Sequence, residues 1–440
     1  MKIPNTTHSK FTSFDNTISI TTLYQKPDRI EMLKEDMTQI TRGAGLSYVP
    51  ASFDQNILVR DFKHFNRILE FDAKQKTVIV ESGITLKKLL EWSFKEKLFF
   101  PIMPGFPEIT IGGCIAANVH GKNPLKDGTC KDHLIWLELY HPKTGFQKIK
   151  SNSEIFDATC GGLGLTGIIT KVKLQLYHLP SDRIRIEPNK ADSLKDAIQI
   201  LQENKDADIA YSVHNGSTSR NFEKGIVRIG MFEEGYDERK TIFPKKTVKL
   251  MKSKFPKSLW GGITTSIINS LLRNMELKKG VNIKNIYESF FPFTQNAKYY
   301  YFLYGKNGFR AYQVLISNGH VNEFIDDLIQ LIKKYSADVT MISIKPFRGE
   351  QKFLQFCRNG MSIILEMKNS QSNINFLSKL DELTISYNAL PYIIKDSRLS
   401  KSVVEKCYPQ YEKFRNILDR VDPDKVFTSY TARKLGLGHS

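Results

Sequence analysis

The chain has 440 residues, of which 41% are hydrophobic and 11% aromatic, and its 64 Lys and Arg outnumber its 46 Asp and Glu. These proportions are typical of a globular protein large enough for more than one domain, and no apolar run is long enough to span a bilayer. The formal charge of +18 favours polyanionic partners, whereas five widely spaced cysteines without a Cys-x-x-Cys pair argue against a disulfide framework or a zinc site.

The N-terminal segment Met1–Asp15 is polar and lacks the apolar core of a signal peptide, so we expect a cytoplasmic protein. Asp28–Met37 is predicted to be helical. The next stretch, Thr41–Tyr48 (T-R-G-A-G-L-S-Y), contains two glycines one residue apart, a turn that can point backbone N–H groups at a phosphate. Further on, β-branched runs predict strands at Asn56–Arg60 and Thr77–Glu81, and apolar residues at helical spacing predict a helix from Leu86 to Leu98 capped by Thr85.

The stretch Pro104–Asn123 reads P-G-F-P-E-I-T-I-G-G-C-I-A-A-N-V-H-G-K-N. Its small residues would let a ligand lie directly against the backbone. The run ends in His120, Lys122 and Asn123, which put a titratable ring, a cation and an amide within four residues. This order predicts a cofactor floor followed by a reactive corner, and the alternative is a packing helix followed by a solvated turn.

A second glycine cluster, residues 162–167, matches the pattern G-x-G-x-x-G of nicotinamide dinucleotide folds. That pattern must follow a strand and open a helix. Here it follows a predicted helix, Ser153–Thr159, and opens a predicted strand, Leu165–Tyr177. The context therefore rejects a nicotinamide site and predicts a tight turn near a cofactor.

After Pro180 the glycine-rich turns give way to longer units, which predict an α+β layer built on an antiparallel or mixed sheet. Metal-ligand spacings are absent, so no metal site is expected. We divide the chain into residues 1–180, 181–385 and a C-terminal segment 386–440. Strands are predicted at His133–Tyr140, Ile209–His214, Gly225–Met231, Lys298–Tyr304, Tyr312–Ser317, Val339–Phe347 and Met361–Met367, and helices at Ala191–Glu203, Val321–Tyr335 and Ile374–Tyr387.

One basic segment stands apart, Phe243–Trp260, where six lysines alternate with apolar residues. This mixture is typical of a peripheral membrane contact, and a solvated loop is the alternative. Nucleic acid is the least favoured polyanion, because the chain has no zinc-finger spacing and no aromatic RNA-binding signature.

Three separated stretches resemble one family, the flavoproteins with a vanillyl-alcohol-oxidase-type (PCMH-type) FAD domain. They are Thr41–Tyr48, Pro104–Asn123 and Cys160–Thr170 (C-G-G-L-G-L-T-G-I-I-T). The run His120–Asn123 and the C-terminal Asp422–Leu435 (D-P-D-K-V-F-T-S-Y-T-A-R-K-L) are most similar to members that oxidise a sugar carried on a polyprenyl phosphate. The resemblance implies a two-subdomain FAD-binding domain and an α+β substrate domain.

The resemblance also implies FAD as cofactor. Its pyrophosphate would be held by the backbones of residues 42–48 and 110–113. Many relatives attach FAD to a histidine at the position of Leu46, and leucine cannot form that bond, so the FAD is expected to be non-covalent. The residues implied in FAD binding are Arg42, Gly43, Ala44, Gly45, Leu46, Ser47, Tyr48, Gly105, Thr110, Ile111, Gly112, Gly113, Ala117, Asn118, Val119, His120, Ile169 and Tyr392.

By the same resemblance, Lys395 and His120 would be catalytic, and Lys122, Tyr48, Gln313 and Lys345 would bind substrate. The implied reaction oxidises the 2-hydroxyl of a polyprenyl-phosphate pentose to a ketone, with the hydride passing to flavin N5. It would be the oxidase half of an epimerase, with a separate ketone reductase as partner. Two alternatives stay open: oxidation of a soluble polyol, aldonolactone or hydroxy acid, and a non-catalytic basic protein that binds membranes or nucleic acid.

Overall fold

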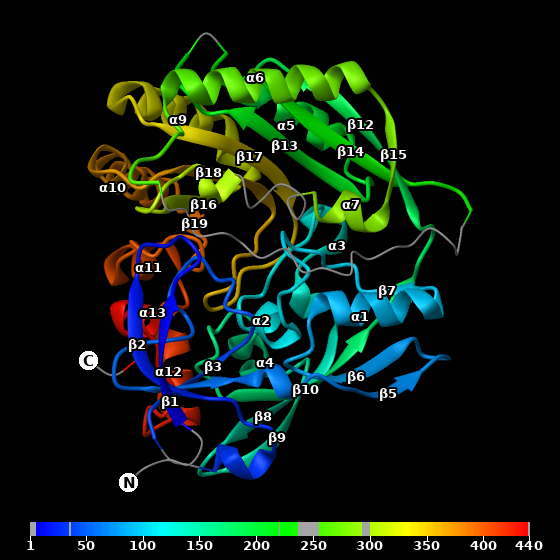
Figure 1. The fold of residues 1–440 in the computed structure, drawn as a ribbon, viewed down its shortest axis with the longest axis vertical. Coiled ribbons are helices and arrows are strands. Elements are labelled where there is room, and N and C mark those ends of the chain that lie inside the picture. Colours follow the sequence, from blue (N-terminus) through cyan, green and yellow to red (C-terminus); the bar gives the residue numbers. More distant parts are fainter. Residues whose placement is uncertain (1–5, 35–36, 220, 236–254, 293–299, 439–440) are drawn as a thin grey trace.

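A computed structural model describes residues 6–34, 37–219, 221–235, 255–292 and 300–438 (Figure 1). They form a mixed α+β structure, as the sequence predicts, in which smaller sheets of the N-terminal part lie below one large antiparallel sheet. The C-terminal helices return to the N-terminal part, where α12 (Tyr411–Val421) packs beside α4 (Glu154–Thr159). No helix among the described residues is long and apolar enough to cross a membrane.

The N-terminal part contains a four-stranded and a five-stranded sheet. In the first, β1 and β2 form an antiparallel hairpin, whereas β4 runs parallel to both β2 and β3. The second is antiparallel throughout. In spatial order, the strands of the first are β1 (Thr6–Thr12), β2 (Ser19–Gln25), β4 (Leu58–Asp61) and β3 (Gln39–Arg42), and those of the second are β5 (Ile68–Asp72), β6 (Thr77–Glu81), β10 (Ile168–Gln175), β8 (Leu134–His141) and β9 (Gly145–Lys150).

Short helices connect these sheets and begin at side-chain caps. Thr85 accepts a hydrogen bond from the Lys88 N–H and starts α1 (Leu86–Ser93), as predicted. Thr110 does the same for the Gly113 N–H and starts α2 (Ile111–Ala116). The remaining small elements of this part are α3 (Pro124–Asp127) and the pair β7 (Leu98–Phe99) and β11 (Tyr177–His178).

The large sheet has eight strands, and every described pairing within it is antiparallel. Its spatial order is β15 (Asn282–Asn285), β12 (Arg183–Ala191), β14 (Gly225–Phe232), β13 (Ile209–Asn215), β17 (Val339–Phe347), β18 (Gly360–Lys368), β16 (Phe309–Ser317) and β19 (Leu390–Pro391). The helices of this half are α5 (Leu194–Glu203), α6 (Gly262–Lys279), α7 (Ile286–Phe290), α9 (Val321–Tyr335), α10 (Gln371–Ser386) and α11 (Lys401–Cys407). The last helix, α13 (Tyr430–Lys434), lies against the N-terminal part, where Arg433 pairs with Asp54 (Figure 1).

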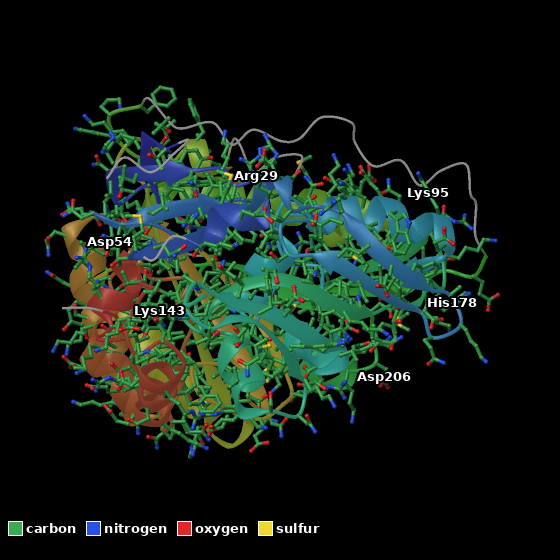
Figure 2. All side chains as sticks on the ribbon, turned by 90° about the horizontal axis from the view of Figure 1, so that it is seen from below. Arg29, Asp54, Lys95, Lys143, His178 and Asp206 are labelled. Carbon is green, nitrogen blue, oxygen red and sulfur yellow. The ribbon has the colours of Figure 1, made fainter. Side chains whose placement is uncertain are left out.

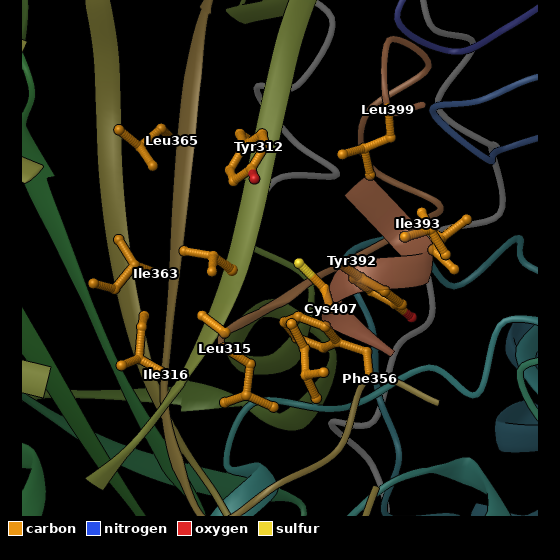
Figure 3. Packing of buried hydrophobic residues seen from close by; sticks show 14 of the residues in the cluster. Tyr312, Leu315, Ile316, Phe356, Ile363, Leu365, Tyr392, Ile393, Leu399 and Cys407 are labelled. Carbon is orange, nitrogen blue, oxygen red and sulfur yellow. The ribbon is translucent and has the colours of Figure 1, made fainter. Parts of the chain in front are cut away.

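Strand alternation separates the two faces of this sheet. On β18, Ile363 and Leu365 are fully buried in an apolar core shared with α5, α9 and α10 (Figure 3). Because neighbouring side chains of a strand point to opposite faces, Ser362, Ile364 and Glu366 face the N-terminal part instead. The core therefore fixes which side chains the sheet presents to the space below it.

Charged side chains are spread around the rest of the surface, where Lys95 and Lys143 are exposed (Figure 2). They do not identify a site by themselves, because a single exposed charge is normal on any protein.

Two predictions of secondary structure were wrong. Where a helix was predicted at Asp28–Met37, the described residues of this range contain only a 3-10 turn, Ile30–Leu33, without a side-chain cap. The strand predicted at Lys298–Tyr304 is helical at residues 300–302. Its aromatic content suggests a strand, but Tyr300 and Tyr304 pack around Trp260, and this tertiary contact overrides the local preference. Most of the basic segment Phe243–Trp260, residues 243–254, lies outside the described residues.

Candidate active site

Two hollows lie end to end between the N-terminal part and the large sheet. The glycine cleft, with about 940 Å³ of empty space, is lined mainly by residues 41–47 and 109–117. The lysine chamber, with about 1200 Å³, contains His120, Lys122, Lys345 and Lys395. Both are lined by Leu46, Ser47, Ile109 and Ile394, so they form one continuous space.

The glycine cleft presents unused backbone donors. No N–H group of residues 43–47 donates a hydrogen bond to an acceptor in the described chain. The Ser47 hydroxyl is buried there and has no partner among the described residues either. Gly43 packs so closely against Thr110 that no side chain fits there, because an added Cβ would lie 2.1 Å from Thr110 Oγ1. Unused donors in a cleft without bulky side chains fit the phosphates of a dinucleotide.

The second stretch predicted to hold the pyrophosphate contributes differently. The N–H groups of Ile111 and Gly112 already donate to the carbonyls of Ile84 and Ser82, at 2.9 and 2.7 Å, and that of Gly113 donates to Thr110 Oγ1. Residues 111–113 therefore cannot offer these donors to a ligand. Their contribution is space, since Gly112 and Gly113 line the cleft without side chains.

The other predicted FAD residues divide into three groups. Arg42, Gly43, Ala44, Gly45, Leu46, Ser47, Thr110, Gly112, Gly113, Ala117 and Ile169 line the cleft, whereas Tyr48, Gly105, Val119, His120 and Tyr392 line the chamber. Ile111 and Asn118 line neither hollow. The Ile111 side chain is fully buried in the core, and Asn118 Oδ1 accepts a hydrogen bond from the Lys131 N–H.

The six residues predicted for catalysis and substrate binding all line the chamber, although they come from distant parts of the chain. His120 and Lys122 follow α2, Gln313 lies on β16, and Lys345 lies on β17. Asn123 anchors the corner beside Lys122, because its side-chain amide donates to the Ala207 carbonyl at 2.5 Å. Lys395 and Tyr48 meet directly, with the lysine nitrogen 3.6 Å from the centre of the tyrosine ring.

His120 is held as a neutral ring. Its Nδ1 is 3.2 Å from the Gly121 carbonyl, which can only accept, so Nδ1 carries the proton. Its Nε2 then accepts from the side-chain amide of Gln313, also at 3.2 Å. Burial and the neighbouring Lys345 hold the pKa of His120 well below its usual value. Because Gln313 occupies the Nε2 lone pair, His120 is not free to act as a base in this arrangement.

The three lysines share a desolvated space. Burial, with a smaller effect of Arg228, lowers the pKa of Lys122 to about 7. Burial and the other two lysines hold the pKa of Lys345 well below its usual value. Burial lowers the pKa of Lys395 to about 8, while the carboxylate of Glu366 opposes this effect. An anion entering the chamber would favour the charged form of all three.

The sequence-based prediction missed Glu366, the carboxyl group of this chamber. It is buried on β18, and the Tyr48 hydroxyl, which is 2.9 Å from that of Tyr301, donates to Glu366 Oε1 at 3.3 Å. Burial raises its pKa, and Lys395 opposes the rise. The sequence did contain a signal for it, since alternate residues of a strand point to the same face. Glu366 is two and four residues after the chamber residues Ile364 and Ser362.

The chamber can thus perform two operations. It can bind an anionic ligand through Lys122 and Lys345, and it can accept a proton at Lys395, whose neutral form is well populated at a pH near 8. Leu46, at the junction with the cleft, offers no nucleophile for a covalent bond to a cofactor. All five cysteines are buried and none lines either hollow.

Comparison with known proteins agrees with this geometry. Residues 31–148 match the FAD binding domain family. The chain is 25% identical to the decaprenylphosphoryl-beta-D-ribose oxidase of Mycolicibacterium smegmatis over 90% of its own length and 89% of that protein. Shorter matches include a D-lactate dehydrogenase of Archaeoglobus fulgidus, 32% identical over 31% of this chain and 32% of that protein. Another is L-gulonolactone oxidase 5 of Arabidopsis thaliana, 27% identical over 35% of this chain and 28% of that protein.

Proposed function

We propose that this chain, in which residues 31–148 match the FAD binding domain family, is a flavin-dependent oxidoreductase that oxidises a secondary hydroxyl of a sugar, the 2-hydroxyl of a polyprenyl-phosphate pentose. It would act as the oxidase half of an epimerase, with a separate ketone reductase completing the reaction. The observation that carries the proposal is the chamber itself, where three lysines with lowered pKa values lie near one neutral histidine beside the cleft that fits FAD. Lys122 is buried, whereas Lys345 and Lys395 are half-buried.

A phosphate on the substrate would complement these lysines. Lys122 and Lys345 have only one carboxyl group, Glu366, among the residues that line the chamber with them. A phosphodiester would add a negative charge to the chamber and keep both ammonium groups protonated. The match to a protein named as an oxidase of a decaprenylphosphoryl ribose extends over 90% of this chain and supports a substrate of this class.

Oxidation of an alcohol removes a proton from oxygen and a hydride from carbon. FAD, when bound, supplies the acceptor for the hydride. The proton passes to Lys395, which is half-buried, has a pKa of about 8 and lies over the ring of Tyr48. Glu366 then stabilises the ammonium group that forms, while the Gln313 amide keeps His120 oriented as a neutral wall residue.

A substrate screen under anaerobic conditions tests the proposal. The purified holoprotein is mixed in detergent with a polyprenyl-phosphate ribose, the same sugar without its phosphate, D-lactate or an aldonolactone, and flavin absorbance is followed. We expect rapid bleaching with the phospholipid sugar, formation of the 2-keto product by mass spectrometry, and slow or no bleaching with the others. Fast bleaching by D-lactate or by an aldonolactone, without bleaching by the phospholipid sugar, would replace the proposal with oxidation of a soluble hydroxy acid or lactone.

A further inference from the structure

Helix α6 (Gly262–Lys279) covers the sheet but exposes apolar side chains to solvent and makes polar contacts on its inner side. Helices that cover a sheet normally bury an apolar stripe and expose polar residues. Here five of the exposed residues are apolar and recur at helical spacing. They form what we call the α6 stripe: Ile263, Ile267, Leu271, Leu272 and Met275, with exposed fractions of 78, 62, 59, 58 and 49%.

The inner side of α6 is held to the sheet by polar contacts. Ser266 Oγ lies 2.7 Å from Ser219 Oγ, and Ser270 Oγ accepts from the side-chain amide of Asn221 at 2.8 Å. Asn269 donates to the Thr340 carbonyl at 2.8 Å. These bonds fix the orientation of the helix about its axis, so the apolar stripe cannot rotate toward the sheet and become buried.

A bidentate ion pair holds the C-terminal half of the helix in the same orientation about its axis. Arg228 on β14 binds both carboxylate oxygens of Glu276, at 2.5 and 2.6 Å. The outward position of the apolar residues is therefore a built feature of the fold, and an exposed stripe of this kind marks an interaction surface.

The charge around the stripe distinguishes between two surfaces that could cover it, a second copy of this chain and a lipid bilayer. The exposed charged residues of α6 are Lys278 and Lys279, since its one carboxyl, Glu276, is bound to Arg228. Lys257, shortly before the helix, is exposed as well, and so is the apolar Leu259. Two copies of this chain meeting through the stripe would bring such lysines together, and each copy carries a formal charge of +18. An anionic bilayer offers both an apolar interior and the opposite charge.

The stripe lies on a helix that also supports the lysine chamber. Ile268, on the inner side of α6, packs in the aromatic cluster that contains Tyr48 and Trp260. Arg228, the partner of Glu276, also stacks on the ring of Tyr211, which lines the chamber. Figure 1 shows α6 along the top of the molecule, away from the edge strands β5 and β9. A surface that contacts the α6 stripe would thus be separated from the chamber wall by α6 itself and the side chains on its inner side.

We propose that the α6 stripe, with Lys278 and Lys279, docks the protein on the surface of an anionic lipid bilayer. The apolar side chains enter the boundary between headgroups and acyl chains, and the lysines meet lipid phosphates. The docking rests on the architecture of α6, and its purpose, delivery of a lipid-linked substrate to the chamber, rests on the proposed function.

Vesicle flotation of the full-length holoprotein tests the docking without any substrate. We expect binding to vesicles of phosphatidylcholine with phosphatidylglycerol, and about tenfold less or lower binding to phosphatidylcholine alone. The variant Ile267→Glu/Leu271→Glu should lose at least about tenfold of the binding to anionic vesicles. Lys278→Gln/Lys279→Gln should weaken it and reduce its dependence on salt.

The matched control is Leu69→Glu/Phe146→Glu, which places the same two charges on exposed apolar positions of β5 and β9. It should bind vesicles like the wild type, and all variants should keep their flavin and their melting temperature. Equal loss in this control, or no binding by the wild type, would overturn the proposal. A wild-type dimer that Ile267→Glu/Leu271→Glu converts to a monomer would assign the stripe to self-association instead. Vesicle binding without oxidation of any lipid-linked sugar would overturn the proposed function and leave the docking intact.

Discussion

The glycine cleft and the lysine chamber are parts of one space, but they are built in opposite ways. The cleft is made of backbone and small side chains from two short stretches, residues 41–47 and 109–117. The chamber is made of polar and titratable side chains that come from the segment after α2, from β16, β17 and β18, and from the turn after β19. The cleft can therefore bind a cofactor because its backbone N–H donors and its space are unused. The chamber acts instead through charged side chains that burial has desolvated.

This contrast predicts that the two regions fail differently when they are altered. A change in the cleft should remove the flavin and with it all activity. A change in the chamber should leave the flavin in place and alter rate, affinity or pH dependence.

The largest effect is expected in the cleft, for Gly112→Val. A Cβ at this position would lie 3.1 Å from both Ser82 Cβ and the Ser82 carbonyl, and the branched methyl groups would extend into the cleft. The protein should purify without flavin and without activity, as seen in its absorbance spectrum. Gly319→Val is the matched control, because an added Cβ there meets nothing within 4 Å. A full complement of FAD in Gly112→Val would disprove this role of the cleft.

The next effect is expected for Lys395→Ala in the chamber. The variant should retain FAD but reduce it about 100-fold more slowly or worse, the scale of rate enhancement that a positioned general base contributes. Stopped-flow bleaching at saturating substrate measures this rate. Lys195→Ala, a substitution of a half-exposed lysine on α5, is the control for loss of a lysine elsewhere. Equal rates for Lys395→Ala and the wild type would remove Lys395 from the mechanism.

Lys122→Ala should act on affinity. Loss of one charged contact to the substrate phosphate should raise the substrate constant about tenfold or more, while the rate of flavin reduction at saturation stays close to that of the wild type. A large fall in that rate with an unchanged substrate constant would show that Lys122 acts on the transition state and not on binding.

The pH dependence should separate the two operations of the chamber. A lysine is charged below its pKa, so Lys122, with a pKa of about 7, loses its charge as the pH rises through 7, and the affinity for an anionic substrate should fall. Lys395 becomes a base as the pH rises through about 8, so the rate of flavin reduction should increase there. In Glu366→Gln this increase should move to lower pH, because the carboxylate raises the pKa of Lys395. A pH profile unchanged by Glu366→Gln would contradict the coupling.

The last prediction concerns the attachment of the flavin and is tested on the wild-type protein. Because Leu46 has no nucleophilic atom and no cysteine lines either hollow, acid precipitation should leave the yellow colour in the supernatant. Colour that sediments with the protein would show a covalent link and point to His120, the one histidine that lines the chamber.

The sequence determined the cleft, because its determinants are local. The glycines of residues 43–45 and 112–113, the capping threonines Thr85 and Thr110, and the apolar spacing of α1 act over distances of a few residues, and all were readable as patterns. The same patterns placed most strands of the large sheet. Local pattern could not show that the N–H groups of Ile111 and Gly112 were already used, because their acceptors lie on another segment, at Ile84 and Ser82.

Only the tertiary structure decided what the chamber contains. Glu366 faces the chamber because Ile363 and Leu365 fill the core on the other face of β18. Which residues of this strand face the core depends on packing against α9 and α10. The helical turn at residues 300–302 and the outward apolar side of α6 arose in the same way, from contacts with Trp260 and with the polar residues of the sheet. Such contacts join residues far apart in the chain, and their burial changes both the preferred conformation and the pKa of each group.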